Sequence, residues 1–252
     1  GDGVTHVRPG DRVFITGTTT PGFTGAGAER TLCRGAQVHP LPASLSFAQG
    51  ASIYIPYGTA WRSLFHRARV QKGESVLVHG ASGGVGIASV QIARAGGFRV
   101  IGTAGTAKGR ELVLREGANA ALDRTAPDYL EKLMALTEAR GVDVILEMAS
   151  HLNLGKDLTV LAKGGRVVVI GCRGPVEINP RDLMSREAAV LGLIIANATD
   201  EEARTMWTAL EAGFADGTLK PVVAREFPMA EAAKAHQAVM EPGALGKIVL
   251  TV

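Results

Sequence analysis

The sequence predicts an α/β protein built around a doubly wound, parallel sheet of the dinucleotide-binding (Rossmann) type. Three observations lead to this prediction: short apolar segments alternate with helical patterns, a glycine-rich turn follows the first of these segments, and the segments number six. Strands that alternate with helices form βαβ units and a parallel sheet. Six parallel strands complete a dinucleotide-binding sheet.

Each of the six apolar segments is expected to form a strand of this sheet. They span residues 75–79, 99–104, 120–122, 143–148, 166–170 and 190–195. Helical patterns fill most of the gaps, at residues 85–95, 110–116, 129–137 and 154–161. Because the apolar residues in the strands are nearly continuous rather than alternating, helices are expected to cover both faces of the sheet.

The sheet domain is expected to cover residues 50–199 and to begin with a helix at 57–68. The flanking parts, 1–49 and 200–252, are expected to belong to one smaller domain that the sheet domain interrupts. In the first flank the patterns predict a strand at 12–15, a loop at 16–27, short strands within 28–41 and a helix capped by Ser44 or Ser46. In the second flank they predict helices at 201–215 and 229–240 and strands at 222–227 and 247–252.

Composition and charge limit the classes of partner. The chain has 252 residues, is 46% hydrophobic and carries a net charge of +3, with its basic residues scattered. This balance suits an anionic small ligand at least as well as a nucleic acid, which favours a clustered basic face. The two cysteines, Cys33 and Cys172, form no CxxC pair. With no recognisable signal sequence and no apolar run of about 20 residues, they predict a cytoplasmic protein.

The glycine-rich turn at 80–86 has the chemistry of a diphosphate site. A dinucleotide's diphosphate binds best against backbone N–H groups at the start of a helix, where the helix dipole also favours an anion. The match is Ala81-x-Gly83-x-x-Gly86, a variant of the GxGxxG fingerprint. In the usual roles, Gly83 allows the diphosphate to approach the backbone and Gly86 allows the helix to pack on the strand.

The second strand indicates which dinucleotide is bound. A site for NAD places Asp or Glu at the end of that strand to bind the ribose 2′-hydroxyl. Here residues 103–106 read Thr-Ala-Gly-Thr, and the first carboxylate is Glu111 in the next helix. Lys108, Arg110 and Arg124 lie nearby in sequence, and Arg124 is the strongest candidate of the three. Their positive charge, with no acidic residue to repel a 2′-phosphate, predicts NADPH as the cofactor.

Several motifs resemble one family along the chain from Gly10 to the C-terminus. These are VLVHGASGGVGIASVQIARA, TAGTAKG, NLGKDL, GGRVVVIGCRG, EINPRDLM and LKPVV. They are similar to the zeta-crystallin-like NADPH:quinone oxidoreductases, which are zinc-independent members of the medium-chain dehydrogenase/reductase superfamily. The resemblance implies a GroES-like catalytic domain interrupted by the Rossmann domain. It also implies that the first large part of that catalytic domain has no counterpart here.

The resemblance extends the expected cofactor site to the ends of the later strands. It implies that 82–85 meet the phosphates, Gly105 lies under the adenosine ribose, and the residues after the fifth and sixth strands face the nicotinamide. Together with the glycine turn and the basic residues, the expected cofactor-binding set is Ser82, Gly83, Gly84, Val85, Gly86, Gly105, Lys108, Arg124, Asn153, Ile170, Gly171, Cys172, Arg173, Leu193, Ile194 and Ile195.

Zinc chemistry is not expected. A structural zinc lobe needs four clustered cysteines, and residues 15–32 contain none. Relatives with a catalytic zinc carry Cys where this chain has Ile55. Without a metal, the expected reaction is reduction of a quinone, which accepts reducing equivalents readily, so the protein contributes proximity rather than a general base. No catalytic side chain is therefore assigned.

Two alternatives to quinone reduction remain open at this stage. One is reduction of an enoyl thioester or 2-alkenal within the same superfamily. The other is a non-catalytic role, as an NADPH-regulated binder of AU-rich RNA or as a crystallin-type structural protein. The apolar sixth strand, at the sheet edge in this topology, predicts a homodimer or homotetramer paired through 190–195, because an unpaired apolar edge favours association.

Overall fold

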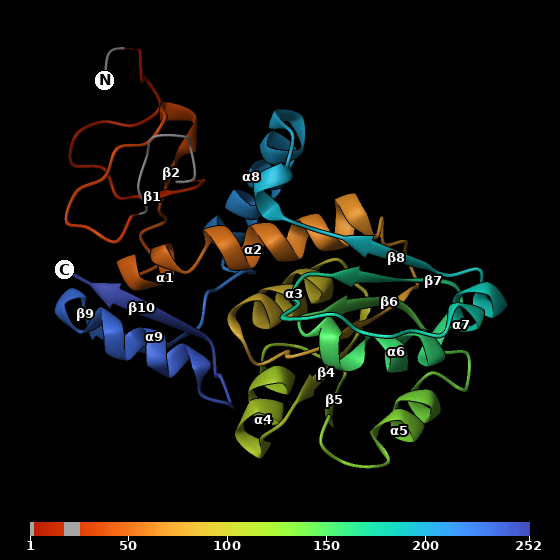
Figure 1. The fold of residues 1–252 in the computed structure, drawn as a ribbon. Helices are drawn as coiled ribbons and strands as arrows, with labels where there is room; N and C mark the ends of the chain where they lie inside the picture. Colours follow the sequence, from red (N-terminus) through yellow and green to blue (C-terminus); the bar gives the residue numbers. More distant parts are fainter. Residues whose placement is uncertain (1–2, 18–25) are drawn as a thin grey trace.

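The computed structural model describes residues 3–17 and 26–252. Its centre is a six-stranded parallel sheet in the order β5-β4-β3-β6-β7-β8 (Figure 1). The strands are β3 (Ser75–Val78), β4 (Arg99–Ala104), β5 (Ala120–Asp123), β6 (Val142–Glu147), β7 (Leu161–Val169) and β8 (Ala189–Gly192). This order is that of the complete dinucleotide-binding sheet, so the expected fold class is confirmed.

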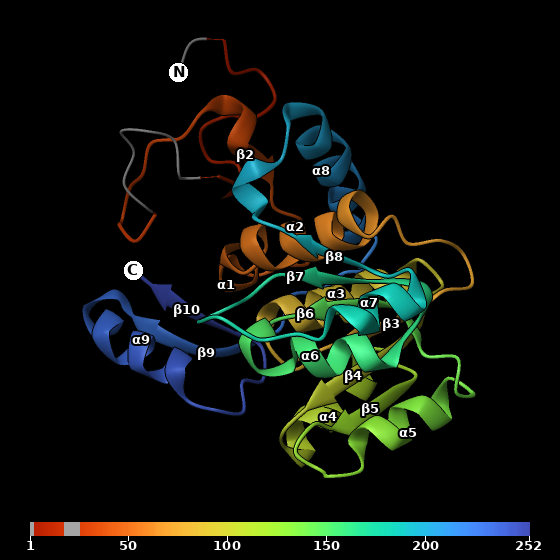
Figure 2. The same ribbon diagram turned by 45° about the vertical axis from the view of Figure 1, so that its right-hand side comes forward.

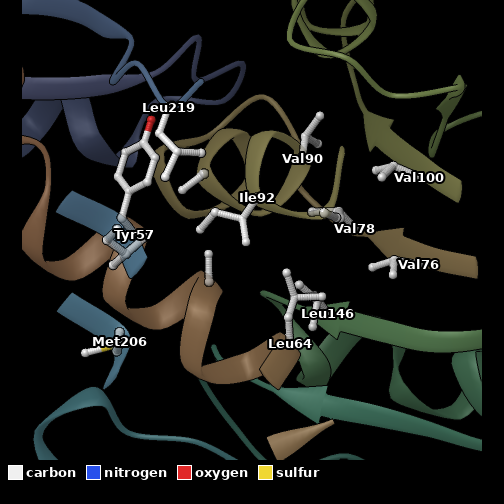
Figure 3. Packing of buried hydrophobic residues seen from close by; sticks show 14 of the residues in the cluster. Tyr57, Leu64, Val76, Val78, Val90, Ile92, Val100, Leu146, Met206 and Leu219 are labelled. Carbon is white, nitrogen blue, oxygen red and sulfur yellow. The ribbon is translucent and has the colours of Figure 1, made fainter. Parts of the chain in front are cut away.

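Helices cover both faces of the sheet, as the continuous apolar strands predicted. They are α2 (Tyr54–Trp61), α3 (Gly84–Ala95), α4 (Ala107–Arg115), α5 (Tyr129–Leu136), α6 (Ser150–Val160) and α7 (Pro180–Arg186). Along β3, Val76 and Val78 pack against the α2 and α3 face, whereas Leu77 packs against α5 and α6. Figure 3 shows Val76 and Val78 of β3 with Val90 and Ile92 of α3 in the first of these clusters.

The flanks contain two small sheets and the helices that accompany them. β1 (Val13–Ile15) pairs antiparallel with β2 (Val38–Pro40), and β9 (Val223–Pro228) pairs parallel with β10 (Lys247–Thr251). The short helix α1 (Phe47–Ala51) lies between these two sheets (Figures 1 and 2). α8 (Asp200–Ala215) and α9 (Ala232–Met240) complete the C-terminal part.

Contacts join the two flanks, although they are far apart in sequence. The rings of Phe14 and Trp207 meet edge to face at 6.1 Å. His39 Nδ1 lies 2.5 Å from a carboxylate oxygen of Glu211 on α8. Gln49 also donates from Nε2 to the carbonyl of Pro221, at 3.0 Å. These contacts agree with one interrupted domain, and the boundaries at 49/50 and 199/200 stay a prediction.

Several element boundaries differ from the sequence prediction. α4 begins at Ala107 rather than at 110, because the Thr106 hydroxyl caps the helix by accepting from the N–H of Gly109. β7 begins at Leu161 rather than at 166, because a register shift against β6 absorbs the Gly164-Gly165 turn. The sixth strand ends at Gly192, so the interval 190–195 predicted for it was too long.

Other differences lie in the helices. The first helix of the sheet domain begins at Tyr54, since Pro56 fits the first turn, and it continues as a π-helical segment, Arg62–Arg67. α7 was not predicted. Ser46, not Ser44, caps α1. Most of the expected loop at 16–27 lies outside the described residues.

No helix within residues 3–17 and 26–252 combines the length and apolar composition of a transmembrane span.

Candidate cofactor site

The candidate site lies where the strand order reverses, between β3 and β6. β3 and β6 are neighbouring parallel strands, with Val78 opposite Leu146. In sheets of this kind a ligand binds outside the carboxyl ends of the strands at the reversal. The loops after β3, β4, β6 and β7 therefore meet along one edge, and these loops carry most of the expected cofactor residues.

The glycine turn after β3 is tight enough to require its glycines. Gly80 has φ +57°, in the left-handed region, and its carbonyl accepts from the N–H of Gly83 at 3.0 Å. A Cβ on Gly86 would lie 2.3 Å from the Gly80 carbonyl oxygen and 2.6 Å from Ala81 Cα. No side chain of an L-residue fits there, so Gly86 has the expected role of close helix–strand packing.

Gly83 has a different environment from Gly86. Within residues 3–17 and 26–252, a Cβ on Gly83 would meet only the Gly80 oxygen, at 3.4 Å, which is ordinary contact. Gly83 is also the N-cap of α3, and no side chain in the described part of the protein caps this helix. The first bond of the α3 ladder runs from the N–H of Ile87 to Gly83. The amides of Gly84, Val85 and Gly86 are thus available to an anion.

The end of β4 carries the expected adenosine contacts. A Cβ on Gly105 would lie 3.5 Å from Nε and 3.8 Å from Nη2 of Arg124, so the guanidinium lies over this glycine. Lys108 is exposed in the first turn of α4. The guanidinium of Arg110 is paired with Asp123 at 2.8 Å. Of the three cations expected near the 2′-phosphate, Arg124 and Lys108 remain open to a ligand.

Met148, just after β6, connects the glycine turn with the end of β7. A Cβ on Gly171 would lie 2.2 Å from the Met148 carbonyl oxygen. A Cβ on Gly80 would lie 3.7 Å from Met148 Cγ. The carbonyl of Gly171 also accepts from the N–H and the hydroxyl of Ser150, at 3.0 and 3.1 Å. Gly171 is therefore held against the start of α6, and its contact with the cofactor stays a prediction.

Asn153 and Cys172 occupy the same edge of the sheet. The amide of Asn153 donates from Nδ2 to Glu147 Oε1 at 3.2 Å, so its orientation is fixed from below by β6. Cys172 is exposed, and a hydrogen bond with the Ser150 side chain, together with nearby backbone groups, lowers the pKa of its thiol. Arg173 donates its backbone N–H to His151 Nδ1 at 3.2 Å.

The three residues expected after the sixth strand are not brought together on one surface. Leu193 is 9% exposed and packs in the main core cluster. Ile195 packs against α2, where a Cβ on Gly58 would lie 3.1 Å from its Cδ1. Ile194 is 63% exposed. Of these three, Ile194 is the side chain most open to a ligand, and cofactor contact by all three stays a prediction.

The C-terminal segment before β10 reaches the glycine turn, which the sequence did not predict. The N–H of Gly246 donates to the carbonyl of Ser82 at 2.9 Å, and Gly246 forms an isolated parallel bridge with Gly83. Next to this bridge, Lys247 Cδ would lie 3.5 Å from a Cβ on Gly84. In the described part of the chain, no carboxylate pairs with the Lys247 ammonium, and burial lowers the pKa of this group.

A cavity of about 360 Å³ lies between this segment and the start of α3. Its lining includes Ile55, Gly84, Val85, Arg225 and Lys247. The lining combines apolar side chains with Lys247 and with Arg225, whose guanidinium is paired with Glu241 at 3.3 Å. The sequence signal for Lys247 was faint: a lone lysine at the start of an apolar strand, just after a Pro-Gly turn.

A buried polar cluster lies directly beneath the cofactor edge. His79 follows β3, Glu147 ends β6 and Asp157 comes from α6, and their side chains are 4%, 0% and 1% exposed. His79 Nε2 lies 2.9 Å from Asp157 Oδ1 and 3.6 Å from Glu147 Oε2. The sequence did not predict this contact of His79 with two carboxylates.

A doubly wound sheet with an uncapped glycine turn at its reversal defines a dinucleotide-binding protein of the dehydrogenase type. Comparison with known proteins agrees with this class. The family model described as "Zinc-binding dehydrogenase" matches residues 84–212. A quinone oxidoreductase of Rattus norvegicus is 47% identical over 251 residues, covering 99% of this chain and 75% of the relative.

Solved structures show the same architecture. An NAD-dependent alcohol dehydrogenase superposes with a TM-score of 0.84 at 30% identity, over 90% of this chain and 65% of that one. The CurK enoyl reductase superposes with a TM-score of 0.76 at 29% identity, over 85% and 66% of the two chains. The chain belongs to the zinc-binding dehydrogenase family, in which it groups with the quinone oxidoreductases, and it is an oxidoreductase with a pyridine-nucleotide fold.

The family description raises the question of zinc. Among the described residues, one group of three potential metal ligands is present, His79 with Glu147 and Asp157. A catalytic zinc needs an open coordination position that faces the substrate. All three side chains are fully buried, and His79 is already hydrogen-bonded to Asp157. This cluster does not fit a catalytic zinc.

Proposed function

We propose that this protein uses NADPH to reduce quinones without a metal. The observation that carries the proposal is the open, uncapped start of α3 beside Gly83, with Arg124 lying over Gly105 about where the adenosine end would bind. The 47% identity to a quinone oxidoreductase over nearly the whole chain supports the acceptor class.

The proposed preference for NADPH over NADH depends on charge. A ribose 2′-phosphate adds nearly two negative charges at neutral pH, and a planar guanidinium binds such a group in bidentate fashion. Arg124 is held over Gly105 without an ion-pair partner among the described residues, whereas Arg110 is neutralised by Asp123. Arg124, with exposed Lys108, is therefore the proposed 2′-phosphate contact.

Lys247 is proposed as a further cofactor contact at the other end of the diphosphate. Its ammonium has no carboxylate partner among the described residues, and its stem lies against Gly84 at the start of α3. Burying an unpaired cation is costly, and an anion at the helix start would offset that cost. A lysine with a lowered pKa in such a place is typical of a functional site.

In the proposed reaction the bound cofactor supplies a hydride, and solvent supplies the proton that completes the hydroquinone. The protein's own contribution is placement: the glycine turn holds the diphosphate, and Asn153 with the 170–173 segment flanks the nicotinamide. Such placement alone accounts for large rate effects when the reacting atoms are held in contact. No side chain is assigned as a general acid or base.

Reduction of an enoyl thioester or alkenal is a second candidate, because the CurK enoyl reductase shares the fold at 29% identity. The test is turnover. Loss of NADPH absorbance is followed with ortho- and para-quinones and with a crotonyl thioester. Faster turnover of quinones supports the proposal, and faster turnover of the thioester contradicts it. A Gly83→Val variant serves as the inactive control, since its side chain fills the diphosphate position.

A non-catalytic role is tested separately. AU-rich RNA binding is measured by gel shift with and without NADPH; tight RNA binding in a protein that turns over no acceptor would contradict the enzymatic proposal. We also propose that the protein acts in the cytoplasm, and cell fractionation tests this location.

Association of subunits through β8 is part of the proposal. β8 is the last strand of the sheet, and Val190 on it is 37% exposed. The variant Val190→Lys tests pairing through this edge, because it places a charge on an exposed side chain of β8. Leu193 is not suitable for this test, because it is part of the core. Sedimentation should show an assembly of two or four chains for the unaltered protein and single chains for Val190→Lys. An unchanged mass contradicts pairing through this edge.

A further inference from the structure

The buried cluster of His79, Glu147 and Asp157 leaves two oxygen atoms unexplained. Glu147 Oε1 accepts from the backbone N–H of Ala149 and from Asn153 Nδ2. Asp157 Oδ1 accepts from His79. Glu147 Oε2 and Asp157 Oδ2 are fully buried and have no partner among the described residues. Buried polar atoms in native proteins nearly always have a partner, so each of these two oxygens is expected to have one.

One additional proton accounts for both atoms. If Glu147 is protonated on Oε2, it donates to Asp157 Oδ2, and each oxygen gains a partner. His79 in its charged form then donates from Nε2 to Asp157 and from Nδ1 to the Thr103 hydroxyl, which lies 3.1 Å away. With this proton on Glu147 and a second one on His79, the cluster as a whole becomes neutral, with one cation, one anion and one neutral acid. Burial of a neutral set costs far less than burial of a net charge.

The electrostatic surroundings favour these two protons. Burial raises the pKa of Glu147 to about 7; the charge of His79 opposes this rise, and the charge of Asp157 adds to it. Burial alone lowers the pKa of His79, but the hydrogen bond and charge of Asp157, with the charge of Glu147, outweigh it and raise the pKa. Arg124 opposes protonation of His79. Tyr129 also faces the cluster, and its own pKa is raised mainly by burial.

We propose that Glu147 is a proton-carrying positioning residue: held by Asp157 and His79, it fixes Asn153 at the cofactor site and takes up a proton when the anionic cofactor binds. The inference rests on the cofactor site proposed above. The physical basis of the proposal is electrostatic. Glu147 is hydrogen-bonded to Asn153, and in its ionised form it would add a negative charge beneath the diphosphate and nicotinamide positions. The incoming proton comes from solvent and ends on Glu147 Oε2, so charge and atoms balance.

The proposal predicts a pH-dependent affinity. With a pKa of about 7, Glu147 is about half ionised at pH 7 in the free protein. If binding holds the proton on, the Kd for NADPH rises roughly fivefold from pH 7 to pH 8, because one proton must be restored. The 2′-phosphate has its own second pKa near 6, and working above pH 7 separates the two titrations.

The test is calorimetric titration with NADPH at pH 7.0, 7.5 and 8.0, in buffers of different ionisation enthalpy, which gives the number of protons taken up. The unaltered protein is expected to take up a proton fraction that grows with pH. Glu147→Gln keeps the hydrogen bonds of the cluster and should lose the uptake and the rise in Kd. Glu131→Gln, which changes an exposed carboxylate on α5, should behave as the unaltered protein. Persistence of the uptake in Glu147→Gln overturns the proposal.

A second measurement needs no variant. Infrared spectroscopy of the unaltered protein should show the carbonyl band of a buried protonated acid, which weakens as the pH rises through 7 and returns when NADPH is added. Absence of this band overturns the proposal, as does a stoichiometric metal found by elemental analysis, since a metal would then bridge the two oxygens. If NADPH gives no heat at all, the proposed function fails, and the infrared band still reports whether Glu147 holds a proton.

Discussion

Adding a single methyl group at Gly86 or at Gly83 is expected to separate the two tasks of the glycine turn. Gly86→Ala should lower stability because its Cβ would overlap backbone on two sides, at 2.3 and 2.6 Å. Gly83→Ala should leave stability nearly unchanged, because its Cβ meets a single atom at 3.4 Å and its φ of −83° suits alanine. The methyl group of Gly83→Ala would instead stand where the diphosphate approaches.

The size of each effect follows from the geometry. Relieving a contact of 2.3 Å requires α3 to move away from the turn by about 1 Å, since ordinary heavy-atom contact lies near 3.5 Å. Overpacking of this kind costs about 1–3 kcal/mol, which corresponds to roughly 2–12 °C in Tm for a chain of this size. A displacement of about 1 Å also lowers turnover by up to roughly 100-fold. For Gly83→Ala we expect at least a tenfold rise in the Kd for NADPH, equal to about 1.4 kcal/mol.

The assay pairs thermal unfolding with calorimetric titration of NADPH for both variants. Gly27→Ala is the matched control, because a Cβ there meets no atom of the described residues within 4 Å. The reasoning is refuted if Gly83→Ala binds NADPH as tightly as the unaltered protein, or if Gly86→Ala unfolds at an unchanged temperature.

Three further predictions concern other parts of the site. Arg124→Ala should raise the Kd for NADPH about tenfold and leave that for NADH unchanged, whereas Lys247→Met should raise both; equal effects of Arg124→Ala on the two cofactors would contradict its role at the 2′-phosphate. Cys172 should react with iodoacetamide faster than Cys33, because hydrogen bonding with Ser150 lowers the pKa of its thiol, and NADPH should protect it; mass spectrometry of the labelled peptides measures both rates. Because the folded-state pKa of Glu147 is raised to about 7 from 4.5, its stabilisation is complete below pH 4.5 and is lost as the pH rises to 7. Urea unfolding should show that the free energy of unfolding falls by up to roughly 3 kcal/mol across this pH window, and Glu147→Gln should lack this fall. The same pH dependence of stability in both proteins would contradict a raised pKa of Glu147.

The sheet could be predicted from sequence because its signals are local. The run Val76–Val78 is apolar on both sides of the strand, and the following glycines mark the turn to α3. The glycine turn was found for the same reason: its residues are adjacent in the chain, and the chemistry of each can be assigned from its position.

The rest of the site depends on which strands pair, and sequence periodicity does not give that. Glu147 meets His79 because β3 pairs with β6 as well as with β4, which places residues 68 positions apart at neighbouring strand ends. Lys247 meets Gly84 because the return of the chain after α9 passes over the glycine turn. Neither contact has a signal within a few residues of either partner.

α7 was a different kind of miss, because a local signal was present. Asn179 caps the helix by accepting from the N–H of Arg181, and Pro180 occupies the first helical position. An Asn-Pro pair before a helical run is typical of a helix start, so α7 could have been predicted from these residues. Leu193, by contrast, had no local signal. Whether an apolar residue at a sheet edge faces the core or a ligand depends on the twist of the strand.

The central claim is that the amides at the start of α3 hold the diphosphate of NADPH while Arg124 binds its 2′-phosphate. Calorimetric titration of the purified protein with NADPH and with NADH, under identical conditions at pH 7.0, tests it most directly. The account predicts one site per chain and at least tenfold tighter binding of NADPH. No measurable heat with NADPH, or tighter binding of NADH, would contradict it.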